Sequence, residues 1–354
     1  MISADTFKFI AYDLSRQLRP NTVHLLVVPD ALWGHYVYEN LKFWLKKASP
    51  EQEALTAEQG KAFAAAQTSR AAFQLSTAAG DYPIYWFSDW ETLPYDQYTP
   101  HPDLISERLR VLAELPTCPQ GIVVVSAAAL SQRLCPQTHL DKYGIHVRTG
   151  DHLPRQQFIQ RLLQAGYQHN ALIKEKGEYA ARGSLLDIFP MGAQAPIRLE
   201  WFDDEIEHIR TFDLQTQFTL SKLRQISILP SHELDLSDAG RVCFRQSARR
   251  LLGDKVEKSG VYESISAGRT PQGLEYYLPL FFDETATLFD YLPPHTMRIE
   301  MPLPVAELKQ HADYCRKRYA RLHSMREHAL LAPEQLWQSE EETIAALSAL
   351  PALA

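Results

Sequence analysis

The stretch GIVVVSAAAL at residues 121–130 decides the fold class of the first part of this chain. Its apolar run after a glycine is typical of a strand buried on both faces, and the alanines behind it favour a helix. HLLVVPD at 24–30 and YPIYWFSDWE at 82–91 have the same character. Helical patterns separate these runs, and a repeated strand–helix order predicts a parallel sheet with helices on its faces.

The segments between these strands are less regular. We expect helices over residues 4–18 and 32–47, and a third helix with Asp103 as its N-cap. Residues 48–80 are rich in Ala, Gln and Glu, which indicates an exposed helix or a mobile insertion. Residues 92–103 hold three prolines, so this segment cannot form a regular element.

A nucleotide-binding sheet of this class carries a glycine-rich phosphate loop of the form GxxxxGK[ST] after its first strand. The Gly60–Lys61 pair is followed by Ala62 and lacks the earlier glycine. No GxGxxG, GxSxG or HExxH motif occurs in the sequence. We therefore expect no bound cofactor and no catalysis by this chain.

The pattern changes after about residue 135. Pro154 begins a helix that Gly166 ends. Strand patterns then follow one another closely, at 184–190, 196–202, 206–213 and 225–230. Such spacing predicts hairpins, so this region is α+β rather than doubly wound. From residue 236 onward the pattern is mainly helical, including 280–292 and 304–330.

Composition limits the class of protein. The 354 residues are 45% apolar and 22% charged, which is ordinary globular composition, and the net charge of −7 argues against a general nucleic-acid coat. No apolar run is long enough to cross a membrane, and no signal peptide is recognisable. We expect a cytoplasmic monomer with four unpaired thiols, of which Cys243 and Cys315 are small buried residues on helices.

Three local features invite a functional interpretation. Asp203, Asp204 and Glu205 could hold a metal in a nuclease, but a polar hairpin turn explains them better. The aromatic stretch at 85–98 could stack bases, but it contains no Lys or Arg, so core packing of Trp86 and Trp90 is favoured.

A residual DNA-binding module is a separate alternative. Its basic patch would consist of Arg245, Arg249 and Arg250. Between residues 166 and 213 acidic side chains outnumber basic ones by nine to five, so this segment is better suited to a protein partner than to DNA.

Several long motifs resemble one bacterial family. They are GEYAARG and LLDIFPMG within residues 166–213, the WFDDEIEHIRTFD run in the same segment, DWETLPYDQYTPHPDLISERL at 89–109, LSQRLCP at 130–136, GLEYYLPLFF at 273–282, and the tail at Pro333–Trp337. This set is similar to the N-terminal, UvrB-like region of the transcription-repair coupling factors, and it covers most of the chain outside 48–80.

The resemblance implies a degenerate helicase-like α/β domain without a phosphate loop, interrupted by an α+β domain and completed by a mainly helical return segment. The implied boundaries are 1–135, 136–213 and 214–354. It also implies a non-catalytic module that recruits the excision-repair ATPase UvrA. RNA polymerase and double-stranded DNA are contacted by later domains of the family, whose full-length members are ATP-dependent translocases. The chain is then an excised fragment or a short relative.

The resemblance also implies which residues contact UvrA. Three arginines of the UvrB relative fall on His169, Ala180 and Arg182, and coupling factors often have arginine where this chain has Gln168. Arg182 is the first candidate, with an ion pair to Glu178 or Asp187 as the structural alternative. The full predicted set is Tyr167, Gln168, His169, Glu178, Arg182 and Phe189, the last as an aromatic anchor or as a core residue.

Overall fold

The computed structural model describes residues 18–47, 73–77, 80–299, 303–325 and 330–353. Its first sheet has the strand order β14-β13-β1-β4-β3-β2. The strands are β1 (Val23–Val28), β2 (Phe73–Thr77), β3 (Gly80–Phe87), β4 (Gly121–Ser126), β13 (Thr296–Ile299) and β14 (Ala352–Leu353). All neighbours pair in parallel except β2, which is antiparallel to β3. The predicted parallel sheet is therefore confirmed.

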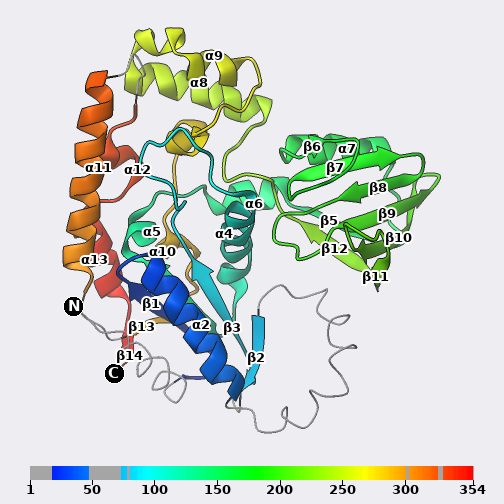
Figure 1. Cartoon of the computed structure of the whole chain (residues 1–354), viewed down its shortest axis with the longest axis horizontal. Helices are drawn as coiled ribbons and strands as arrows, with labels where there is room; N and C mark the ends of the chain where they lie inside the picture. Colours follow the sequence, from blue (N-terminus) through cyan, green and yellow to red (C-terminus); the bar gives the residue numbers. More distant parts are fainter. Residues whose placement is uncertain (1–17, 48–72, 78–79, 300–302, 326–329, 354) are drawn as a thin grey trace.

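Both faces of the first sheet are covered, as the apolar character of its strands requires. Helix α2 (Ala31–Lys47) packs against Leu26, Ile84 and Val124 on one face. On the other face lie α4 (Pro102–Glu114), the short 3₁₀ helix η2 (Leu115–Thr117), α5 (Ala127–Ser131), α6 (Gln137–Tyr143) and α10 (Leu288–Tyr291). Figure 1 shows these layers around the sheet.

The second sheet consists of β6 to β11 in the order β11-β10-β9-β8-β7-β6. Its strands are β6 (Gln168–His169), β7 (Glu178–Arg182), β8 (Leu185–Ile188), β9 (Ile197–Phe202), β10 (Glu205–Phe212) and β11 (Thr219–Leu223). Helix α7 (Arg155–Gln164) packs on one face, with Phe158 and Leu162 fully buried. The chain enters along β5 (Ile145–Arg148) and leaves along β12 (Gln225–Ile228), which pair antiparallel.

The rest of the chain is mainly helical and encloses a further core. Its elements are α8 (Asp238–Leu252), η3 (Asp254–Lys258), α9 (Gly260–Ser266), η4 (Leu274–Phe281), α11 (Val305–Met325), α12 (Pro333–Leu336) and α13 (Glu340–Ala349). Trp90 and Tyr95 from the first part of the chain are buried in this core. None of the helices within the described ranges is long and apolar enough to cross a membrane.

Several local expectations need correction. His101, not Asp103, caps α4, because Pro102 begins the helix and the His101 ring accepts a bond from the Asp103 amide. Residues 280–292 hold only the last turn of η4 and the four-residue α10. Residues 73–77 form a strand, whereas the expected helix over 4–18 and most of 48–80 lie outside the described residues. Cys243 is half-buried rather than buried.

One helix joins the two sheets. On α4, Asp103 pairs with Lys176 at 2.9 Å, and the Ser106 hydroxyl accepts a bond from the Gly192 amide at 2.8 Å. Met191 next to that glycine is buried in the core of the first sheet. The second sheet, to the right in Figure 1, is therefore held by specific contacts and not only by its two connecting strands.

A buried ion pair lies at the same junction. Arg108 of α4 is 1% exposed and donates two bonds to the carboxylate of Glu233, at 2.5 and 3.0 Å, just after the chain leaves β12. Its remaining nitrogen donates to the Ser88 carbonyl at the end of β3, at 2.5 Å. The planar guanidinium lies over the Phe87 ring, 4.5 Å from its centre. Removing one partner of a buried ion pair leaves the other charge buried and unpaired, which strongly lowers the stability of the fold.

We expect Glu233→Ala to lower the free energy of unfolding by about 3–5 kcal/mol, because Arg108 would keep a buried charge without a partner. Urea unfolding followed by tryptophan fluorescence measures this change. Glu257→Ala, which removes the exposed Arg249–Glu257 pair, is the control and should cost less than about 1 kcal/mol. An equal loss of unfolding free energy in the two variants would contradict a special stabilising role for the buried Arg108–Glu233 pair.

Glu275 predicts a pH dependence of stability. Burial, with Glu233 nearby, raises the pKa of this carboxyl from 4.5 to about 7. The folded state therefore binds this proton more tightly than the unfolded state, and stability falls as the pH rises from 4.5 through 7. Glu275→Gln should remove that contribution, at most about 1.4 kcal/mol per pH unit. Unfolding measured across this range checks it, with exposed Glu263→Gln expected to keep the slope.

Candidate functional site

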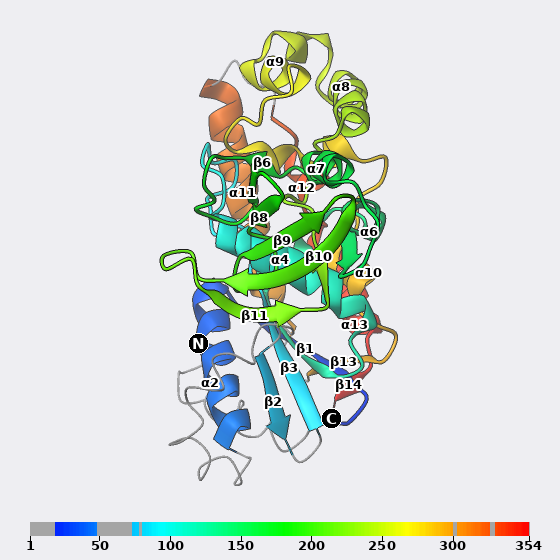
Figure 2. The same cartoon turned by 90° about the vertical axis from the view of Figure 1, so that its right-hand side faces the viewer.

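The second sheet presents one face to solvent. Strand alternation sends Leu186, Ile188 and Leu199 toward α7 and sends their neighbours to the opposite side, which we call the open face. The register aligns Ala180, Asp187, Arg198, Arg210 and Lys222 in one row across it, and Arg182, Leu185, Glu200 and His208 in the next. Figure 2 turns these strands toward the viewer.

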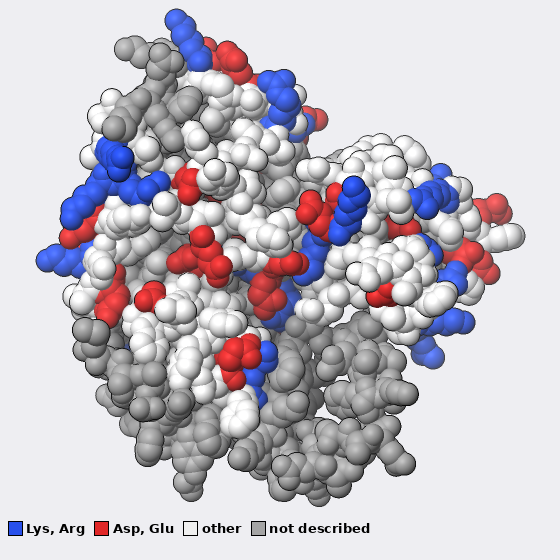
Figure 3. Space-filling view, in the orientation of Figure 1, with Lys and Arg blue, Asp and Glu red and all other residues white. Residues whose placement is uncertain are grey.

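Most charges of the open face are paired within the sheet. Arg198 donates to both oxygens of Asp187, at 2.6 and 2.8 Å, and its guanidinium lies 4.4 Å from the centre of the Phe212 ring. The bond to Asp187 raises the pKa of Arg198. Arg210 pairs with one carboxylate oxygen of Glu200. Figure 3, in the orientation of Figure 1, shows basic and acidic side chains interspersed over the part of the molecule at the right, where the second sheet lies.

Arg182 differs from the other two arginines of the open face. It is exposed, and the hydrogen bond described for its guanidinium goes to the Ala171 carbonyl, at 2.7 Å. The alternative ion pairs do not form, because Asp187 binds Arg198 and Glu178 binds the backbone amides of residues 174 and 175. Among the residues the structure describes, Arg182 has no carboxylate partner. Its charge is available to an incoming anion.

Three other predicted residues surround the same edge. Gln168 and His169 form β6 and are exposed, and the His169 ring lies 5.3 Å from the ring of Tyr179. Glu178 is half-buried and caps the loop before β7 through its bonds to backbone amides. These side chains lie on neighbouring strands, since β6 pairs with β7.

Phe189 combines its two interpretations. It is half-buried and packs against a small cluster of Ile173, Ala180 and Phe212, in which Ala180 belongs to the open face. The Lys176 ammonium lies 5.9 Å from its ring centre. Ala180 is 2% exposed in that cluster, so a side chain as large as the arginine that the resemblance implies for the UvrB relative would have to displace its neighbours.

Tyr167 needs correction as a contact residue, because it is 2% exposed. Its hydroxyl donates to the Leu229 carbonyl at 2.8 Å and accepts a bond from the Met191 amide at 3.0 Å. It therefore fixes the segments that enter and leave the second sheet. The Gly-Tyr pattern alone could not distinguish a surface tyrosine from one whose hydroxyl is satisfied inside.

Sequence reasoning did not single out Arg198, Arg210 and Lys222 as members of one surface. Alternation places Arg198 and Arg210 outside, but their common row depends on the strand register, which includes a shift in β10. Lys222 is exposed on the edge strand β11. The alternation of each strand predicts that these side chains face outward, but no single motif predicts that they lie in one row.

The other candidate features do not assemble a site. Asp203–Glu205 forms the tight turn between β9 and β10, with a positive φ of 51° at Asp203. Within the described ranges, no three His, Cys, Asp or Glu side chains lie together in a way that could hold a metal ion. On α8, Arg249 pairs with Glu257 and Arg245 is half-buried, whereas Arg250 is exposed and has no ion-pair partner among the side chains that the structure describes.

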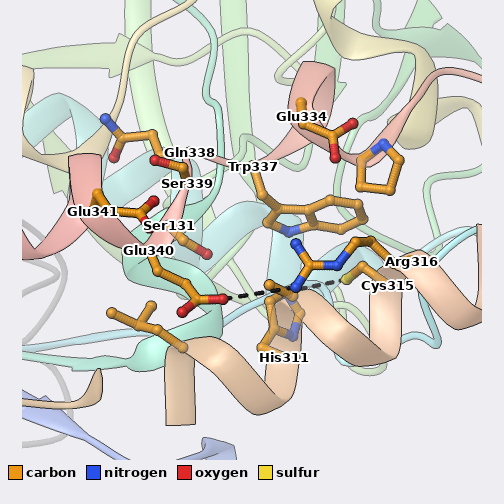
Figure 4. A pocket seen from close by; sticks show the side chains of 13 residues that line it. Ser131, His311, Cys315, Arg316, Glu334, Trp337, Gln338, Ser339, Glu340 and Glu341 are labelled. Carbon is orange, nitrogen blue, oxygen red and sulfur yellow. Dashed lines mark hydrogen bonds and ion pairs between the residues drawn. The ribbon is translucent and has the colours of Figure 1, made fainter. Parts of the chain in front are cut away.

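A cavity of about 290 Å³ lies between α11, α12 and α13 (Figure 4). Its polar groups bind one another. His311 lies 3.5 Å from the Cys315 sulfur, and Arg316 lies 3.7 Å from Glu340. Burial lowers the pKa of His311, which favours its neutral form. The cavity is separate from the open face.

Comparison with known proteins identifies the second sheet. The family model described as UvrB interaction domain matches residues 145–234. The transcription-repair-coupling factor of Haemophilus influenzae is 41% identical over 75% of this chain and 23% of its own length. The Escherichia coli protein is 38% identical over 77% of this chain and 24% of its own length. The Myxococcus xanthus protein is 33% identical over 57% of this chain and 17% of its own length. The chain spans about a quarter of the first two relatives.

We expect Tyr167→Phe to lower the free energy of unfolding by about 1–3 kcal/mol, because the buried Met191 amide and Leu229 carbonyl would each lose a partner. Denaturant unfolding measures the cost. Tyr314→Phe on α11, which changes a partly exposed tyrosine, is the control and should change stability by less than about 0.5 kcal/mol. A neutral Tyr167→Phe would mean that the hydroxyl does not hold the junction.

Proposed function

Because this chain belongs, as their UvrB-like N-terminal region, to the transcription-repair-coupling factors, we propose that its second sheet binds the excision-repair ATPase UvrA. The binding face is the open face, and its contact edge is formed by Arg182, Gln168 and His169. Through this contact the region recruits UvrA to RNA polymerase stalled at damaged DNA.

The unpaired guanidinium of Arg182 carries the proposal. The other two arginines of the open face are already neutralised by Asp187 and Glu200. An exposed arginine on a rigid strand can form a bidentate pair with a carboxylate of a partner, and arginine is common among the residues that dominate binding energy. Phe189, packed against Ala180 of the same face, adds a half-buried aromatic surface.

The proposed role is binding rather than catalysis. Contacts with RNA polymerase and double-stranded DNA, and the ATP-driven translocation of the family, belong in this proposal to parts of the protein outside this chain. A nucleic-acid role for the open face is not favoured, because the guanidinium groups of Arg198 and Arg210 face carboxylates in the sheet instead of phosphates.

Calorimetric titration of purified UvrA into this chain tests the proposal. We expect binding by the unaltered chain and at least a tenfold weaker affinity for Arg182→Ala, which corresponds to about 1.4 kcal/mol. The loss follows from leaving the partner's carboxylate without its charged hydrogen-bond donor. Arg224→Ala is the matched control, since Arg224 is also an exposed arginine of this unit but lies between β11 and β12.

Two results would refute the proposal. The first is an unaltered chain that does not bind UvrA. The second is an equal loss for Arg182→Ala and Arg224→Ala, which would point to general charge attraction without a contact at the open face. Circular dichroism of both variants confirms that each remains folded.

A further inference from the structure

A second exposed surface is built from the loop that follows β3, residues 88–101, which we call the β3 loop. Its backbone is unusual, because Glu91 and Tyr95 have positive φ angles of 52° and 61° without being glycine. Residues with side chains adopt this region rarely and at a cost in free energy. The surrounding structure must therefore impose the conformation.

Buried contacts brace the β3 loop from below. The Tyr95 ring is 2% exposed and lies 5.7 Å from the ring of Tyr276 and 5.9 Å from that of Trp337. The Tyr276 hydroxyl donates to the Leu93 carbonyl at 2.8 Å, and Arg318 of α11 donates to the Pro94 carbonyl at 2.7 Å. The loop is thus pinned at its apex by side chains from η4 and α11, beside α12 (Figure 1).

This bracing leaves two large apolar side chains outside. Leu93 is 49% exposed and Tyr98 is 69% exposed, one on each side of the buried Pro94–Tyr95 pair. A leucine and a tyrosine on a rigid loop lose little conformational freedom when a partner covers them. Tyrosine in particular is enriched among the anchors of protein interfaces.

The charged side chains that the β3 loop itself contributes are all acidic. Asp89, Glu91 and Asp96 lie in the loop, and within the described part of the chain no Lys or Arg forms an ion pair with any of them. Asp89 and Asp96 instead accept bonds from the amides of Glu91 and Gln97. The sequence contains no Lys or Arg between Arg70 and Arg108, and Arg108 itself is buried against Glu233.

Two further observations indicate that the carboxylates of the β3 loop are not neutralised by neighbouring cations. Partial burial, with Asp89 nearby, raises the pKa of Glu91, so the loop already holds two carboxylates close together. Arg318 of α11 reaches the loop but donates to the Pro94 carbonyl rather than to a carboxylate, and Lys176 pairs with Asp103 beyond the loop's end. An acidic rim of this kind repels nucleic acid and attracts basic protein segments.

We propose that the β3 loop is a docking surface for a protein segment that carries an apolar side chain flanked by Lys or Arg. The apolar side chain packs between Leu93 and Tyr98, and the flanking cations pair with Asp89, Glu91 and Asp96. This surface lies on the first domain and does not depend on UvrA binding by the open face.

Fluorescence anisotropy with two labelled hexapeptides, RKLWKR and EELWEE, tests the proposal. We expect the unaltered chain to bind RKLWKR and not EELWEE. Leu93→Ser with Tyr98→Ser should weaken binding at least tenfold, and so should Asp89→Asn with Glu91→Gln and Asp96→Asn. The matched control is Phe202→Ser with Asp204→Asn, an exposed phenylalanine and aspartate in the β9–β10 hairpin of the second sheet, which should leave the affinity unchanged.

Every other outcome overturns the proposal. Absence of RKLWKR binding, an equal loss in the control, or equal binding of EELWEE would each mean that the β3 loop does not select a basic apolar segment. Binding of a labelled single-stranded oligonucleotide that the loop variants abolish would make the surface a nucleic-acid site instead. Thermal unfolding midpoints that match the unaltered chain show that a loss of binding is not a loss of folding.

Discussion

The ion pair between Arg108 and Glu233 is the constraint on which the arrangement of the two sheets depends. It joins a helix of the first sheet to the segment that leaves the second, and its third bond reaches the end of β3, where the β3 loop begins. A buried charge pair is stable only when both partners and their remaining hydrogen bonds are in place together. The same ion pair therefore contacts both the segment that leaves the second sheet and the residue at which the β3 loop begins.

The open face illustrates how a highly charged sheet can leave few charges free for a partner. Asp187, Arg198, Glu200 and Arg210 satisfy one another across strands, so their contribution to any partner is reduced by the pairing they would lose. Arg182 lies at the edge of these pairs, and the partner of its guanidinium among the described residues is the Ala171 carbonyl. In the proposed contact, specificity therefore comes from the one arginine whose charge is not neutralised within the sheet.

The sequence predicted the parallel sheet, an inserted α+β unit and the mainly helical return segment, because buried strands and hairpins have clear periodic patterns. It did not reveal β13 and β14, whose short strands follow prolines and pair with residues far away in the chain. It proposed both Arg182 and Tyr167 as contact residues. Only the fold shows that the Arg182 side chain is exposed and that the Tyr167 side chain is buried. The roles of Arg108 and Glu233 required contacts across 125 residues.

The pairing of β5 with β12 also has a consequence for how the chain acquires its fold during synthesis. Every strand of the second sheet lies between these two, so that unit can complete its core once residue 228 has emerged from the ribosome. The first sheet cannot, because β1 at its centre must wait for β13. Strands β1, β3 and β4 are therefore synthesised early, but their sheet is completed only after the second sheet, which is inserted between β4 and β13, can already have folded.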